Sequence, residues 1–247
     1  MKLLAIGNSF SQDATAYLKQ LADSAGVDAK IVNLYIGGCS LQMHAQNIAQ
    51  DTQSYSYEYS GAPTGRMVSI REALEEDRWD AVTVQQVSGE SGIPESYEPY
   101  GTQVLDCVKR YAPQAKIWFH KTWANETDSN HGDFPRYGCS QADMYRAICI
   151  AAAQFAQRHA LPIIPTGDVI QRLRGVPLFA YGNGGVSLCR DGFHMSLTCG
   201  RYAAALTWFE TLMGNAELVT FRPEGVGTAE AEMIKRTVKS VCKETRG

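Results

Sequence analysis

Short apolar runs alternate with longer amphipathic stretches along most of this chain, and this alternation constrains the fold more than any other feature. The apolar runs have the length of buried strands and lie at 2–6, 30–35, 81–85, 116–120 and 161–165. Stretches with helical periodicity lie between these runs, at 12–25, 98–111 and 141–159, and after the last of them, at 198–213. This order is typical of a parallel sheet covered by helices on both faces. We therefore predict a three-layer α/β/α sandwich built on a five-stranded parallel sheet.

The length of 247 residues fits one α/β domain, and we treat 1–247 as a single domain. Tyrosines alternate with polar residues at 55–59, and a glycine- and proline-containing turn follows at 61–65. This pattern predicts a small hairpin insertion near 53–69. Apolar residues four apart predict a C-terminal helix near 229–243.

The composition excludes several classes of function. The net charge is −3, so no basic excess is available to neutralise nucleic-acid phosphates. No apolar run approaches the length of a transmembrane helix, and the run at 1–7 is too short for a signal peptide. We expect neither a nucleic acid nor a membrane as partner. The oligomeric state is left open.

The seven cysteines are scattered, and none forms a Cys-x-x-Cys pair. This spacing supports neither a disulfide framework nor a zinc site. We therefore expect no metal, no cofactor and a cytoplasmic location.

Ligands of open α/β sheets bind at the carboxyl edge of the strands, so residues that directly follow a strand are site candidates. Ser9 lies two residues beyond Gly7, where the first strand would turn into a helix. Its hydroxyl would face the sheet edge, and its N–H would point outward with those of the helix start, ready to bind an oxyanion. The alternative is that Asn8, Ser9 or Ser11 merely caps the helix.

A serine nucleophile needs a base, usually histidine, and the histidine needs a group that fixes its tautomer. Asp191 and His194 are three residues apart, so the carboxylate can reach the imidazole within one turn. Alone, this spacing also fits a structural histidine and a turn aspartate. Gly38, after the second strand, can offer a backbone N–H to an oxyanion.

The motifs GNSFS (7–11), IGGCSL (36–41), VQQVSG (84–89) and DGFH (191–194) occur in an order that resembles the SGNH, or GDSL, hydrolases. The resemblance spans nearly the whole chain and is greatest to a poorly characterised bacterial branch of these enzymes. It implies a flavodoxin-like fold and hydrolysis of esters, often acetyl or acyl groups on carbohydrates or lipids. It also implies that Ser9 is the nucleophile and that Asp191 and His194 supply the orienter and the base.

The third motif departs from the Gly-x-Asn-Asp that the family usually carries there. An amide from Gln85 or Gln86 would have to replace the asparagine as an oxyanion donor; we favour Gln85, and strand alternation places the two on opposite faces. Trp123 follows the fourth strand and has two interpretations, stacking on a sugar or acyl group or packing in the interior.

We expect a serine esterase that acts through an acyl-enzyme on a small-molecule ester or an acylated carbohydrate. The altered third motif leaves a second hypothesis, a carbohydrate-binding protein on the same fold without catalysis. Acyl transfer is the third, because it proceeds through the same acyl-enzyme.

Overall fold

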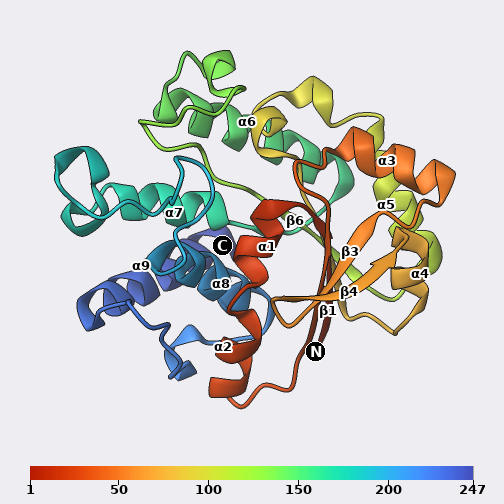
Figure 1. Cartoon of the computed structure of the whole chain (residues 1–247), viewed down its shortest axis with the longest axis horizontal. Helices are drawn as coiled ribbons and strands as arrows, with labels where there is room; N and C mark the ends of the chain where they lie inside the picture. Colours follow the sequence, from red (N-terminus) through yellow and green to blue (C-terminus); the bar gives the residue numbers. More distant parts are fainter. Residues whose placement is uncertain (247) are drawn as a thin grey trace.

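The computed structural model describes residues 1–246, and a mixed sheet lies at its centre (Figure 1). Five of its strands are parallel, namely β1 (Lys2–Gly7), β2 (Lys30–Tyr35), β5 (Ala81–Val84), β6 (Lys116–His120) and β7 (Ile163–Ile164). They lie in the order β2-β1-β5-β6-β7. This is the flavodoxin-like order, in which the chain reverses its direction of winding next to the first strand. The predicted sandwich with a flavodoxin-like core is confirmed.

The sheet has seven strands in the described chain rather than the predicted five, because a hairpin extends it. Strands β3 (Tyr55–Tyr59) and β4 (Ala62–Val68) pair with each other, and β3 pairs antiparallel with β2. Tyr55 and Tyr57 bury their side chains on one face of the sheet. The alternating tyrosines thus give the hairpin an apolar face, and the open edge of β2 supplies the hydrogen bonds that hold it.

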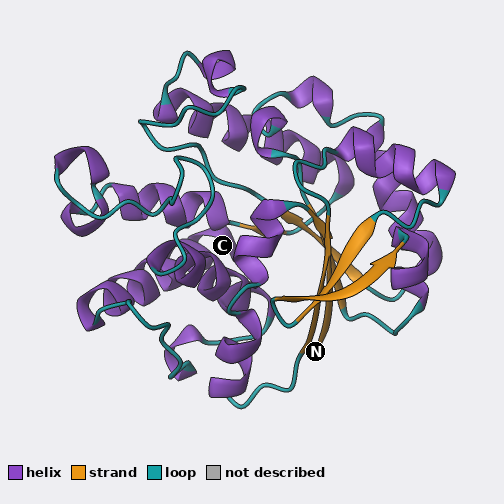
Figure 2. Ribbon diagram, viewed as in Figure 1, coloured by secondary structure: helices purple, strands orange, loops and turns teal. Residues whose placement is uncertain are grey.

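Helices cover both faces of the sheet (Figure 2). One layer comprises α1 (Ser9–Thr15), α2 (Leu18–Ser24), α7 (Thr166–Arg174), α8 (Cys199–Leu212) and α9 (Thr228–Arg246). The other comprises α3 (Leu41–Gln50), α4 (Ile70–Glu75), α5 (Tyr100–Tyr111) and α6 (Gln141–His159). Strand β1 shows why two cores form, since Leu3 and Ala5 pack in the first layer and Leu4 and Ile6 in the second.

The stretch predicted as one helix over 12–25 forms two helices, and the first begins at Ser9, almost directly after β1. This short connection brings the start of α1 to the carboxyl edge of the sheet, where the segments after β2, β5 and β6 also emerge. Across residues 1–246, no helix combines the length and the apolar character needed to cross a bilayer.

Candidate active site

Ser9 is the first residue of α1 and is partly exposed. The residue that caps the helix is Asn8, whose Oδ1 accepts a hydrogen bond of 3.0 Å from the N–H of Phe10. The Ser11 hydroxyl donates to the Asn8 carbonyl and to Asn33 Oδ1. Ser9 therefore has no capping task, and its own N–H has no hydrogen-bond partner within residues 1–246.

Asp191 and His194 bond to each other within one turn of the loop that leads to α8. Asp191 Oδ2 lies 2.7 Å from His194 Nδ1, while Oδ1 accepts hydrogen bonds from the backbone N–H of His194 at 2.8 Å and of Phe193 at 3.2 Å. Partial burial opposes ionisation of Asp191, but these hydrogen bonds prevail and lower the pKa of its carboxyl. An ionised Asp191 keeps the proton of His194 on Nδ1 and leaves Nε2 as an acceptor.

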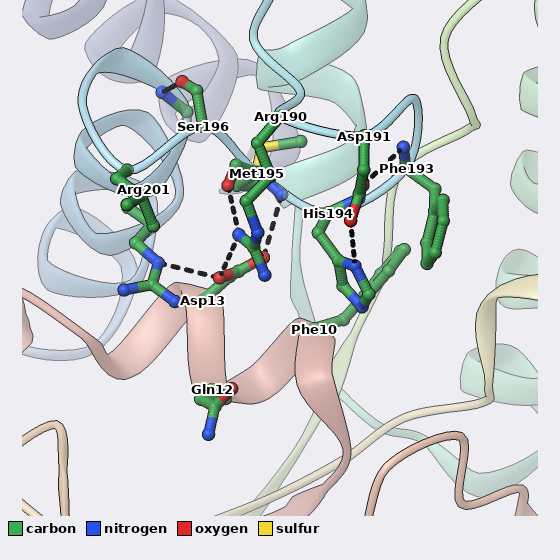
Figure 3. Close-up of polar contacts among 12 residues, drawn as sticks. Phe10, Gln12, Asp13, Arg190, Asp191, Phe193, His194, Met195, Ser196 and Arg201 are labelled. Atoms are coloured by element: carbon green, nitrogen blue, oxygen red, sulfur yellow. Dashed lines mark hydrogen bonds and ion pairs between the residues drawn. The ribbon is translucent and has the colours of Figure 1, made fainter. Parts of the chain in front are cut away.

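The imidazole of His194 lies at the start of α1. Its ring centre is 6.1 Å from that of Phe10, the residue after Ser9, and Figure 3 shows the imidazole pointing toward this end of the helix. The loop that carries Asp191 and His194 therefore lies beside the N-terminal end of α1, whose first residue is Ser9.

Trp123 fixes this arrangement from the interior. Its ring stacks on Phe10 with centres 4.1 Å apart, and its Nε1 donates a hydrogen bond of 2.7 Å to the carbonyl of Phe193. Its exposed fraction is 0%, so neither face of the indole is open to a sugar or an acyl group. Of the two interpretations of Trp123, packing describes its place in the structure.

Gly38 lies in the exposed turn after β2 with φ of +66°, a conformation that favours glycine. Its N–H has no hydrogen-bond partner among the residues that the structure describes. The turn is tied to the start of α1, because Asn8 Nδ2 donates a hydrogen bond of 2.9 Å to the carbonyl of Cys39. Asn8 thereby links two segments whose N–H groups, on Ser9 and Gly38, have no partner among the residues that the structure describes.

Gln85 and Gln86 are both buried, and their amides bond to neighbouring residues. Gln85 Nε2 donates to Asn8 Oδ1 at 2.8 Å, and Gln85 Oε1 accepts from His120 Nδ1 at 2.7 Å. Gln86 Oε1 accepts from the backbone N–H of Leu41, and its Nε2 donates to Ser96. Gln85 therefore orients Asn8, and Gln86 holds the start of α3.

Burial keeps His120 neutral by lowering its pKa to about 3. In that form Nδ1 carries the proton that is donated to Gln85 Oε1, which fixes the amide so that its Nε2 faces Asn8. Asn8 is one of the three residues that the sequence offers as a cap of the helix, and it is the one that caps it, but the bonds that Asn8 and His120 form with Gln85 are not predicted from the sequence. Their positions in the sequence could have indicated them, since Asn8 directly follows one parallel strand and His120 ends another.

A model of the family described as "Domain of unknown function (DUF4886)" matches residues 2–241 of the chain. No curated protein matches the chain in sequence. Among solved structures, a DUF4886 family protein from Bacteroides uniformis ATCC 8492 is 36% identical with a TM-score of 0.90, and the match covers 98% of this chain and 94% of that one.

More distant structures share the fold. A proposed SGNH hydrolase from Slackia heliotrinireducens is 23% identical with a TM-score of 0.57, over 86% of this chain and 98% of that chain. An acetylxylan esterase from Geobacillus stearothermophilus is 14% identical with a TM-score of 0.56, over 90% and 97% of the two chains. The fold is therefore that of the SGNH hydrolases, as the sequence motifs predicted.

Proposed function

The chain belongs to the DUF4886 family, and we propose that it is a serine esterase that cleaves a carboxylic ester through an acyl-enzyme. The observation that carries the proposal is the 2.7 Å hydrogen bond between Asp191 and His194 at the start of α1, where Ser9 stands. A base with a fixed tautomer next to a partly exposed serine is the arrangement that nucleophilic catalysis requires.

In the proposed reaction, Ser9 Oγ attacks the ester carbonyl carbon while His194 Nε2 accepts the hydroxyl proton. The negative charge that develops on the carbonyl oxygen is stabilised by the N–H groups of Ser9 and Gly38. The bond between the carbonyl carbon and the alcohol oxygen then breaks, and His194 returns the proton to the leaving alcohol. Water deprotonated by His194 attacks the acyl-enzyme and releases the acid and free Ser9.

Asp191 supports both proton transfers without itself gaining a proton. Its lowered pKa keeps the carboxylate ionised at neutral pH, so that it stabilises the imidazolium formed when His194 takes the Ser9 proton. The two hydrogen bonds that it accepts from the backbone N–H groups of Phe193 and His194 hold the carboxylate in place.

We propose an acetyl or short acyl group as the acyl part, carried by a small alcohol or a carbohydrate. The support is the similarity in fold to an acetylxylan esterase. The ester would enter beside the Gly38 turn, which is exposed, whereas the Phe10 ring beside the imidazole is stacked on the buried Trp123 and leaves no room for a ligand there.

The test combines activity and labelling. The protein should hydrolyse nitrophenyl acetate and acetylated xylo-oligosaccharides, and a fluorophosphonate probe should label Ser9. Ser9→Ala should abolish both, whereas Ser24→Ala, which removes a hydroxyl at the end of α2, should change neither. Hydrolysis at the wild-type rate by the Ser9→Ala variant would overturn the assignment.

One observation favours a second candidate, a carbohydrate-binding protein without catalysis. Gln86 Nε2 donates to the carbonyl and the hydroxyl of Ser96, and Gln85 is buried and uses one of its two Nε2 hydrogens on Asn8, so at most one N–H of Gln85 is left for the third oxyanion donor of the family pattern. Absence of Ser9 labelling together with glycan binding would favour that candidate. Acyl transfer would show itself instead as ester products when acceptor alcohols are added.

A further inference from the structure

Asp13 is a carboxylate with no exposed surface on the helix that begins with Ser9. The two residues are four apart, so they project from the same side of α1. Figure 3 shows Asp13 facing the loop that carries His194, whereas Gln12 points away from it. The nucleophile and this buried carboxylate therefore belong to one short rigid element.

The partners of Asp13 lie on both sides of the Asp191–His194 turn. Arg190 Nη1 is 3.0 Å from Asp13 Oδ1 and 3.2 Å from Oδ2, and the backbone N–H of Met195 donates to Oδ2 at 2.8 Å. Arg190 also donates to the carbonyl of Met195, which closes the turn on itself. Arg201 Nε, on α8, completes the group at 2.8 Å from Oδ1.

This geometry fixes the loop at the residue before Asp191 and at the residue after His194. Between 184 and 198 the loop forms no regular helix or strand. An antiparallel bridge of Cys189 with Met195 closes its turn, so the placement of this closed turn against α1 depends on single contacts such as those of Asp13. Charge-assisted hydrogen bonds are shorter and stronger than neutral ones. Removing one partner of a buried ion pair is strongly destabilising, because it leaves an uncompensated charge in the interior. The same carboxylate that ties the loop is part of the helix that presents Ser9.

We propose that Asp13 is a positioning residue that sets the location of His194 relative to Ser9 by holding Arg190 and Met195 against α1. The inference rests on the proposed esterase function. A purely structural role would lower stability alone, whereas a positioning role lowers turnover in protein that is fully folded.

The first variant is Asp13→Asn, which keeps the shape of the side chain and removes its charge. The second is Arg190→Gln, which removes the ion pair between Arg190 and Asp13 by changing a side chain that is 30% exposed. Misplacement of a catalytic group by about 1 Å can cost about a hundredfold in rate. We expect kcat on nitrophenyl acetate to fall by about this factor in Asp13→Asn and by less in Arg190→Gln, with KM unchanged. Arg172→Gln, which breaks the surface ion pair with Glu244, is the matched control and should keep wild-type kcat.

A second readout does not depend on activity. The proton on His194 Nδ1, bonded to Asp191, should give a downfield ¹H NMR signal that is assigned by its loss in His194→Gln. We expect this signal to shift or to exchange faster in both Asp13→Asn and Arg190→Gln, but not in Arg172→Gln.

The outcomes separate the two hypotheses. Folded Asp13→Asn and Arg190→Gln proteins with wild-type kcat and an unchanged His194 signal would overturn the role of Asp13. If the Asp13→Asn protein does not fold, kcat and the His194 signal of Arg190→Gln decide whether Asp13 positions His194. If the wild-type protein neither hydrolyses esters nor labels at Ser9, the esterase proposal fails, and the NMR comparison still decides whether Asp13 positions His194.

Discussion

The Nε2 group of Gln85 donates a hydrogen bond of 2.8 Å to Oδ1 of Asn8, the residue immediately before Ser9. This bond is the middle of a buried chain that begins at His120 and ends at the carbonyl of Cys39. It connects the ends of β6, β5 and β1 with the turn after β2. The start of α1 is therefore held by three buried side chains, those of Asn8, Gln85 and His120.

Gln85→Ala should both lower the stability of the protein and lower its rate of ester hydrolysis. The change leaves the Nδ1–H of His120 without a buried acceptor, and an unsatisfied buried polar group costs about 1–3 kcal/mol. We expect the free energy of unfolding, measured by urea denaturation, to fall by about that amount, and kcat to fall because Asn8 loses one of the three hydrogen bonds that hold its side chain. Gln53→Ala, an exposed counterpart, should change neither quantity, and equal stability of the two variants would contradict this assignment.

The sequence was most informative where the determinants are local. The alternation of apolar runs and helical stretches predicts the layers, and the Asp191–His194 bond forms within a single turn. The hairpin at 55–68 was harder to place, because its pairing with β2 depends on an edge left open by the rest of the sheet.

The supporting side chains of the site could not be predicted for a related reason. Asp13 forms its ion pairs with Arg190 and Arg201, which are 177 and 188 residues away in the chain, so no local sequence pattern indicates them. Strand alternation separates Gln85 from Gln86 but does not show that both amides bond to neighbouring segments. The burial of Trp123 likewise depends on stacking against Phe10 from another element.

Gly38→Ala tests whether the turn after β2 takes part in the reaction. Gly38 has φ of +66° with open space where a Cβ would lie, and Gly26, after α2, has φ of +71° and equally open surroundings. Alanine in this conformation costs about 1–2 kcal/mol, so both substitutions should lower the free energy of unfolding similarly. Only Gly38→Ala should also lower kcat, because it strains the backbone that presents an oxyanion donor.

The comparison is made by measuring unfolding in urea and nitrophenyl acetate hydrolysis for both variants. A loss of kcat in Gly26→Ala as large as that in Gly38→Ala would show that the effect is one of stability and not of the turn.

Asp191→Asn should remove activity while preserving the fold. An asparagine can offer its amide N–H to His194 Nδ1, which then favours the tautomer with its proton on Nε2, the wrong one for accepting the Ser9 proton. We expect kcat to fall by about four orders of magnitude, the loss that a serine protease shows for the same change. Asp106→Asn, an exposed change on α5, is the control and should keep wild-type kcat. Wild-type kcat in Asp191→Asn would mean that the Asp191 carboxylate has no part in catalysis.

Two fully buried histidines, His44 and His120, make the stability of the fold depend on pH. Burial lowers the pKa of each to about 3, whereas an unfolded chain titrates histidine near about 6.5. Between these values the unfolded state binds a proton that the native state does not. Stability should therefore be highest above about pH 6.5 and should decrease as the pH falls toward 3.

Each such histidine contributes a slope of about 1.4 kcal/mol per pH unit once the unfolded state is protonated, so His44 and His120 together should give about 2.7. His120→Gln keeps a donor for Gln85 Oε1 and should reduce the slope by about half, whatever its effect on stability at neutral pH. The measurement is the free energy of unfolding in urea between about pH 6 and 5. The carboxyl groups, which begin to titrate near about pH 5, contribute equally to the wild-type protein and the variant. Gln53→Ala, which removes no titratable group at an exposed position, serves as the control and should leave the slope unchanged. An unchanged slope in His120→Gln would mean that His120 is protonated in the native state, and that Gln85 is then not oriented by a neutral imidazole.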